Sequence, residues 1–198
     1  IPMRDMRPKE HKEELVGAFV KEPQTGFHDW VVSFDLNSLY PHLIMQYNIS
    51  PETMFPDKRP VNQDDLLNKR IDTSDGNCLA ANGAMFKRDK QGMLPRIIQK
   101  EYDDRVTFKK KMLEAEQMYA NTKDKKYEKL ARKYYIIQHS KKISLNSAYG
   151  AIGNKYFRYY DHNQAEAITM SGQLNIKWIE KKLNEYFNKL YKTKDDYI

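Results

Sequence analysis

Two short stretches of the sequence combine residue types suited to binding a metal-bound phosphate. Asp35 follows an apolar, β-like run and precedes a tight turn and a helix start at Pro41. A carboxylate there offers a hard oxygen ligand to a divalent metal, and the next backbone carbonyl, at Leu36, offers a second. Backbone N–H groups at a helix start can point at phosphate oxygens; here they belong to Ser38, Leu39 and Tyr40. An isolated Asp in this position is otherwise typical of an Asx turn or a helix cap.

The second stretch places a cation, an amide and an aromatic ring on one helix face. Lys142, Asn146 and Tyr149 stand at positions i, i+4 and i+7, and Gly150 follows them. A glycine beside the ring lets the backbone approach a base pair closely. Core packing of Tyr149 is the rival interpretation. Taken together, the two stretches predict a site for a nucleoside triphosphate.

A second pair of cations belongs to the same hypothesis. Arg105 and Lys109 lie four residues apart on a preceding helix. If that helix and the helix of Lys142 form an antiparallel hairpin, the pairs line one surface, where Arg clasps phosphate bidentately and Lys acts as a point charge. For each cation alone, an unpartnered surface side chain is the favoured interpretation. Tyr40, just beyond the expected metal ligand, could lie beneath the sugar and exclude a 2′-hydroxyl.

The elements that must position these residues follow from periodicity and turn signals. We expect strands at residues 17–20 and 30–34 joined by a hairpin loop, a helix at 41–47, and a polar, turn-rich region at 51–92. Within that region a short helix at 64–70 and a β-hairpin at 82–93 are possible. Residues 1–16 are interpreted as an extended lead-in.

The second half of the chain is predicted to be mainly helical. One long helix should begin near Pro95 and reach residue 119, and a second should run from about Asp124 to Tyr149, closed by Gly150 as a cap. A short link between them makes an antiparallel hairpin. The aromatic run at residues 156–160 could be extended. Asp161 is a plausible N-cap for a last helix that reaches about residue 190.

Charge and cysteine content narrow the function classes. The net charge of the 198 residues is +7, and residues 109–142 alone hold 11 Lys/Arg against 4 Asp/Glu. A regional basic excess attracts polyanions, nucleic acid first, although a well-solvated helix hairpin would look the same. The single cysteine, Cys78, excludes an internal disulfide and agrees with a cytoplasmic location. No apolar run approaches the roughly 20 residues needed to span a bilayer.

The motifs resemble those of a known enzyme family. Residues 35–41 (DLNSLYP) resemble motif A of family B DNA polymerases, and residues 142–150 (KISLNSAYG) resemble their motif B. Residues 17–23 (GAFVKEP), 48–53 (NISPET) and 157–161 (FRYYD) further resemble the replicative polymerases of large tailed bacteriophages. Residues 56–83 match least well.

The resemblance implies an α+β fold: a partial antiparallel palm sheet with packed helices, plus a long antiparallel helix hairpin as the fingers. Residues 1–94 would be an N-terminal palm portion, 95–150 the fingers, and 151–198 the return to the palm. Catalysis would involve Asp35 and Lys142, and Mg²⁺ would bind Asp35 and the Leu36 carbonyl. The residues implied in binding the triphosphate are Ser38, Leu39, Tyr40, Arg105, Lys109, Lys142 and Asn146; Tyr149 and Gly150 would contact the nascent base pair.

The same resemblance implies partners and a missing part. A deoxynucleoside triphosphate and primer–template DNA would be the substrates, and the exonuclease, the rest of the palm, the thumb and a sliding clamp would be partners, in a cell or host-cell cytoplasm. The family's third motif, Asp-Thr-Asp, supplies the second metal-binding carboxylate and does not occur in the sequence. We therefore expect the chain to be inactive alone. The alternatives are a non-catalytic basic nucleic-acid-binding module and a metal-dependent nuclease.

Overall fold

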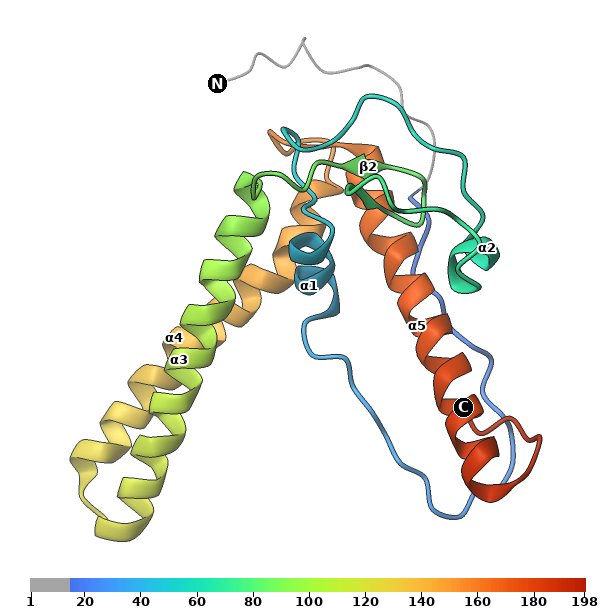
Figure 1. The fold of residues 1–198 in the computed structure, drawn as a ribbon. Helices are drawn as coiled ribbons and strands as arrows, with labels where there is room; N and C mark the ends of the chain where they lie inside the picture. The colour runs from blue at the N-terminus through green and yellow to red at the C-terminus, as the bar shows by residue number, and fades with distance from the viewer. Residues whose placement is uncertain (1–14) are drawn as a thin grey trace.

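Two arms diverge from a common junction in the structure, a computed structural model that describes residues 15–198 (Figure 1). One arm is a helix hairpin, and the other is a long helix accompanied by an extended segment. The elements in chain order are α1 (Leu39–Gln46), α2 (Gln63–Leu67), β1 (Cys78–Leu79), β2 (Met85–Phe86), α3 (Met93–Thr122), α4 (Lys125–Ile152) and α5 (His162–Tyr191). The predicted α+β class with a long helix hairpin is confirmed, and residues 1–14 of the predicted lead-in lie outside the described part.

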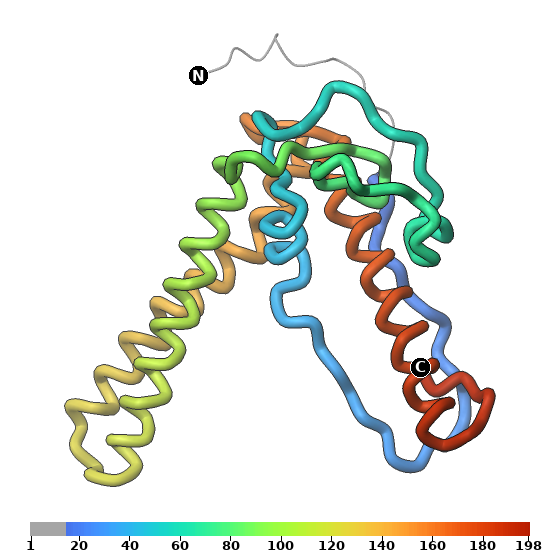
Figure 2. The backbone as a smooth tube through the Cα atoms, in the orientation of Figure 1, coloured from blue at the N-terminus to red at the C-terminus, as the bar shows by residue number. Residues whose placement is uncertain are grey.

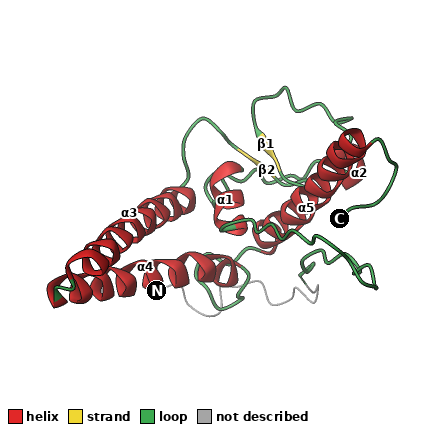
Figure 3. Cartoon of the chain, turned by 90° about the horizontal axis from the view of Figure 1, so that it is seen from below, coloured by secondary structure: helices red, strands yellow, loops and turns green. Residues whose placement is uncertain are grey.

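The helix hairpin consists of α3 and α4, which run side by side in two views (Figures 1 and 3). Along their interface, Met112 and Ala115 of α3 and Ala131 of α4 are buried. Lys123 adopts a left-handed conformation with φ 57° and ends α3, and the Asp124 side chain accepts a hydrogen bond of 2.8 Å from Lys126 N–H to start α4. The predicted break at residues 121–124 is therefore confirmed.

The predicted cap at Gly150 is wrong. Helix α4 continues through Gly150 to Ile152, and Gly153 takes the cap position, where its N–H donates to Tyr149 O at 3.0 Å. Continuation places the side chain of Ile152, 2% exposed, in the hydrophobic core. Burial of that side chain favours the extra helical residues over an earlier stop.

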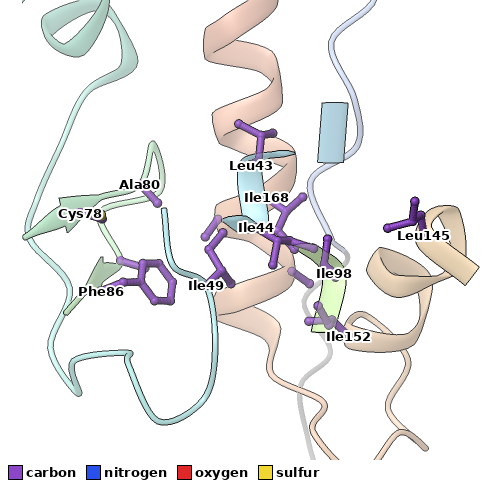
Figure 4. Close-up of a cluster of buried hydrophobic side chains, with 13 residues drawn as sticks. Leu43, Ile44, Ile49, Cys78, Ala80, Phe86, Ile98, Leu145, Ile152 and Ile168 are labelled. Atoms are coloured by element: carbon purple, nitrogen blue, oxygen red, sulfur yellow. The ribbon is translucent and has the colours of Figure 1, made fainter. Parts of the chain in front are cut away.

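The core lies at the junction, where α1 contacts α3, α4 and α5 (Figure 4). The labelled core side chains come from all of these elements, from the small sheet and from the loops after α1 and β1: Leu43, Ile44, Ile49, Cys78, Ala80, Phe86, Ile98, Leu145, Ile152 and Ile168. Helix α1 supplies its apolar side chains to this cluster, which agrees with the helix predicted at residues 41–47. The helix begins two residues earlier than Pro41, after Ser38 in a left-handed conformation.

The small sheet and α2 occupy the turn-rich region. Helix α2 confirms the short helix, with the Asn62 side chain accepting from Asp64 N–H at 2.9 Å. The β-hairpin, however, pairs residues 78–79 with 85–86 instead of lying at 82–93. Gly83 has φ 84°, and a Cβ there would lie 2.1 Å from the Arg59 carbonyl oxygen, so the turn requires glycine. After β2, the chain enters α3 at Met93 instead of returning as a strand.

The predicted strands at residues 17–20 and 30–34 are also wrong, because neither forms a β-ladder. The first stretch runs beside α5, and the second leaves it and crosses to α1, so the two arms of the expected hairpin separate (Figure 2). A strand needs a neighbour to accept and donate its backbone hydrogen bonds. Within residues 15–198 no such neighbour lies beside either stretch.

The last helix begins as predicted. The Asp161 side chain accepts a hydrogen bond of 2.9 Å from Gln164 N–H, and α5 continues to Tyr191. Residues 156–160 form turns and not an extended run. None of the helices among the described residues is long and apolar enough to cross a membrane.

Candidate nucleotide site

Two tyrosines from the two motifs meet at the junction. Tyr40 lies in the first turn of α1 and Tyr149 near the end of α4, and their ring centroids are 4.8 Å apart with planes inclined at 59°. Both rings are half-buried against the core, and this burial raises the pKa of both hydroxyls. A Cβ at Gly150 would meet no atom within 4 Å, so the backbone beside the pair is open. The arrangement agrees with core packing of Tyr149 and leaves one side of the pair accessible.

A direct hydrogen bond joins the turn of motif A to the helix hairpin. Arg105 of α3 donates through Nη1 to Ser38 Oγ at 3.2 Å. The Nε atom of Arg105 is buried and has no hydrogen-bond partner among the described residues. A buried, unpaired guanidinium N–H retains the capacity to bind an anion. The structure thus brings Ser38 and Arg105 together, as the sequence hypothesis requires.

The remaining predicted cations are Lys142 of α4 and Lys109, near the middle of α3. Lys141 donates to Glu101 at 2.8 Å and to Asp104 at 3.0 Å, which fixes α4 against α3 at the level of Arg105. These hydrogen bonds raise the pKa of Lys141. Its neighbour Lys142 is exposed. Among residues 15–198, no side chain forms a hydrogen bond or an ion pair with the side chains of Lys142, Lys109 or Asn146.

The expected metal ligands, unlike the two tyrosines and Arg105, lie on an exposed segment and not against the core. Asp35 and Leu36 lie in the extended segment before α1, and both are exposed. Among the described residues, no group of three or more His, Cys, Asp or Glu side chains is arranged to hold a metal ion. A hard divalent cation takes six or more oxygen ligands. The Asp35 carboxylate and the Leu36 carbonyl suit such a cation but supply only some of the ligands that it needs.

Sequence reasoning missed three residues that shape the site. Gly172 of α5 faces the Tyr40 ring, where a Cβ would lie 3.0 Å from Cε1. His42 packs edge-on against Tyr102 of α3, with ring centroids 4.8 Å apart, and its Nδ1 lies 2.9 Å from Ser38 O. Lys141 is the third, through its ion pairs. For Gly172, the sequence did carry a signal, because a glycine inside a long helix is unfavourable unless packing requires it.

Comparison with known proteins identifies the family. The sequence profile described as DNA polymerase family B matches residues 1–197. The chain therefore belongs to the family B DNA polymerases.

The similar proteins include phage and archaeal enzymes. The chain is 34% identical to the DNA-directed DNA polymerase of Enterobacteria phage T4 over 93% of its own length, and 33% identical to that of Escherichia phage RB69 over 91%. It is 30% identical to a DNA polymerase of Pyrococcus glycovorans over 89%. The chain spans about a quarter of the length of the two phage relatives and a fifth of the archaeal one.

Proposed function

We propose that the chain is the palm and fingers portion of a template-directed DNA polymerase, which adds deoxynucleotides to a primer 3′ end. The observation that carries the proposal is the meeting of the two motifs. Ser38 and Tyr40 of the first contact Arg105 of the hairpin and Tyr149 of the second. In this division, residues 1–94 and 151–198 belong to the palm, and residues 95–150 form the fingers.

Three cations of the hairpin, Arg105, Lys109 and Lys142, would bind the triphosphate. Arg105 has an unpaired buried Nε, and Lys109 and Lys142 have no side-chain partner among residues 15–198, so all three keep charge available for phosphate oxygens. Asn146 and the N–H groups at the start of α1, from Ser38 to Tyr40, would add hydrogen bonds. In this proposal Lys142 also acts in catalysis, because its ammonium offsets the negative charge that builds on the phosphates.

The aromatic pair would contact the sugar and the base. Tyr40 would lie beneath the sugar and exclude a 2′-hydroxyl, and Tyr149 with the open backbone at Gly150 would contact the nascent base pair. Burial restrains both rings, and a restrained ring is a better steric gauge than a mobile one.

Asp35 and the Leu36 carbonyl would hold part of a two-metal site for Mg²⁺. When bound, such ions neutralise charge on the attacking and leaving oxygens. The described residues supply one carboxylate to it, so further ligands must come from the rest of the polymerase. Primer–template DNA, the exonuclease, the remaining palm, the thumb and a sliding clamp complete the proposed set of partners, in the cytoplasm of a cell or of a phage host.

The test is template-directed primer extension with Mg²⁺ and all four deoxynucleotides. The chain is assayed alone and together with polypeptides that supply the remaining polymerase parts. We expect extension only in the mixture, and a loss of at least about a thousandfold in Asp35→Ala. Asp57→Ala, which removes another exposed carboxylate, is the matched control and should retain activity. Extension by the chain alone would contradict the incomplete metal site.

One observation favours a second candidate, a non-catalytic nucleic-acid-binding module. Lys125, Lys126, Lys129 and Lys133 surround Leu130 at the start of α4, at the tip of the hairpin. Such a cluster binds a phosphate backbone without any need for Asp35. Salt-dependent DNA binding with no extension in the complete mixture would support this module over the polymerase.

A further inference from the structure

A glycine of α5 determines how closely the Tyr40 ring approaches that helix. Gly172 is buried in the first half of α5, and the side chains nearest to it are Tyr40 and Leu43 of α1. A Cβ at this position would lie 3.0 Å from Cε1 and 3.7 Å from Cδ1 of Tyr40, and 3.6 Å from Cδ1 of Leu43. The first distance is shorter than ordinary van der Waals contact. The ring therefore occupies space that any other residue at 172 would take from it.

The Tyr40 ring is confined from two directions. Gly172 of α5 lies along one ring edge, and Tyr149 of α4 lies 4.8 Å away, centroid to centroid. Helix α1, which carries Tyr40, contacts both α4 and α5 at the junction (Figure 1). Displacement of the ring by a Cβ at residue 172 would be away from α5, and α1 packs between α5 and the hairpin of α3 and α4. That hairpin carries Arg105, Lys109 and Lys142.

We propose that Gly172 is a positioning residue, which sets the place of the Tyr40 ring and thereby the space left for the sugar of the incoming nucleotide. The inference rests on the proposed function, in which Tyr40 lies beneath that sugar. Glycine inside a 30-residue helix costs stability relative to alanine. The close approach of the ring gives a reason for a glycine at this position.

A larger side chain at residue 172 should weaken binding of the incoming nucleotide. Alanine at 172 requires the ring to shift by a few tenths of an ångström, and valine requires more. Because the shift narrows the space above the ring, the KM for a deoxynucleotide should rise roughly fivefold to tenfold in Gly172→Ala, since a displacement of about 1 Å can cost about a hundredfold. A ribonucleotide adds an oxygen on the crowded side, so its kcat/KM should fall further than that of the matching deoxynucleotide.

The experiment measures kcat and KM for one deoxynucleotide and the matching ribonucleotide, with the chain assembled into the complete polymerase. The variants are Gly172→Ala and Gly172→Val, each with Tyr40 intact and with Tyr40→Ala. Gly17→Ala is the matched control, because a Cβ there meets nothing within 4 Å. We expect a graded rise in KM with Tyr40 present, little change in kcat, and no effect of residue 172 once the ring is removed.

Three results of the kinetic experiment would overturn the inference. Equal losses for both sugars would show a purely structural role, as would losses that persist in Tyr40→Ala. Absence of extension by the wild-type mixture would refute the proposed function, and this inference with it. A separate measurement does not depend on activity: ¹⁹F spectra of the chain with 3-fluorotyrosine, in which Tyr40→Phe assigns the Tyr40 signal. An unchanged Tyr40 signal in Gly172→Ala would refute the positioning role while leaving the proposed function standing.

Discussion

Helix α1 and the segment that precedes it have similar apolar content and opposite environments. In α1, Leu43 and Ile44 are at most 1% exposed, whereas Trp30 and Val31 are 97% and 78% exposed. A helix satisfies its backbone hydrogen bonds within itself and can bury one face at once, but an extended segment needs a partner strand first. Apolar composition therefore predicts burial only where the backbone is also satisfied.

The candidate site also has one part that packs against the core and one part that lies on the exposed segment. Tyr40, Tyr149 and Arg105 are held by contacts made within this chain. Asp35 lies on the exposed segment, where none of the described side chains forms a hydrogen bond or an ion pair with it. The part of the site proposed to contact the nucleotide is thus prearranged by the fold, whereas the proposed metal site needs further ligands that residues 15–198 do not supply.

The largest expected difference comes from truncating one apolar side chain in each region. Ile44→Ala removes a fully buried side chain from the core and should lower the free energy of unfolding by about 3 kcal/mol. Val32→Ala removes an exposed one and should change it by less than about 0.5 kcal/mol. Urea unfolding followed by circular dichroism measures both. Equal losses would show that the segment is packed in solution, and would remove the contrast between the regions.

The next prediction concerns Lys142, the exposed cation of α4 that is proposed to bind the triphosphate. Lys142→Ala should raise the KM for the deoxynucleotide about tenfold to a hundredfold in the complete polymerase, since a hydrogen bond to a charged group is worth about 1.5–3 kcal/mol. Lys133→Ala removes an equally exposed cation from the hairpin tip and is the control. Steady-state extension kinetics give both values. Equal effects of the two substitutions would favour general electrostatic binding over a defined triphosphate site.

The sequence predicts the helices of this fold better than its strands. Helical periodicity and N-caps such as Asp124 and Asp161 are local, so α3, α4 and α5 follow from them. The strands at residues 17–20 and 30–34 depend on neighbours that composition does not reveal. Gly150 shows the same limit, because burial of Ile152 overrides a local stop signal.

Within the site, spacing indicates which residues share a helix face but not which helices meet. The hypothesis that Ser38, Arg105, Tyr40 and Tyr149 belong to one site agrees with the contacts between them. Gly172 lies 132 positions after Tyr40 in the sequence, and its role depends on the approach of α5 to α1. No local pattern specifies that approach. A glycine in a helix interior was the one indication in the sequence. It does not show that Tyr40 is the neighbouring residue or that close packing requires the glycine.

The start of α3 offers the smallest and most specific test of how the hairpin is attached to the junction. Its N-cap residue, Gly92, has no side chain to accept a hydrogen bond. The Glu52 carboxylate instead accepts from Met93 N–H and from Ser50 Oγ, and Ser50 Oγ accepts from Leu94 N–H at 3.3 Å. Residues 50–52 thus cap α3 from outside the helix.

This cap should make the stability of the chain depend on pH. Burial raises the pKa of the Glu52 carboxyl, but the hydrogen bonds from Ser50 and Met93 outweigh burial and lower the pKa below its ordinary 4.5. A lowered folded-state pKa contributes stability that is present above 4.5 and is lost as the pH falls through the folded value. Because solvent screens this exposed carboxylate, Glu52→Gln should cost at most about 1 kcal/mol at pH 7 and much less near pH 2. Urea unfolding at both pH values measures this loss of unfolding free energy. The control is Glu114→Gln, at an exposed position of α3. An equal loss in Glu52→Gln at both pH values would mean that the negative charge of Glu52 does not stabilise the start of α3.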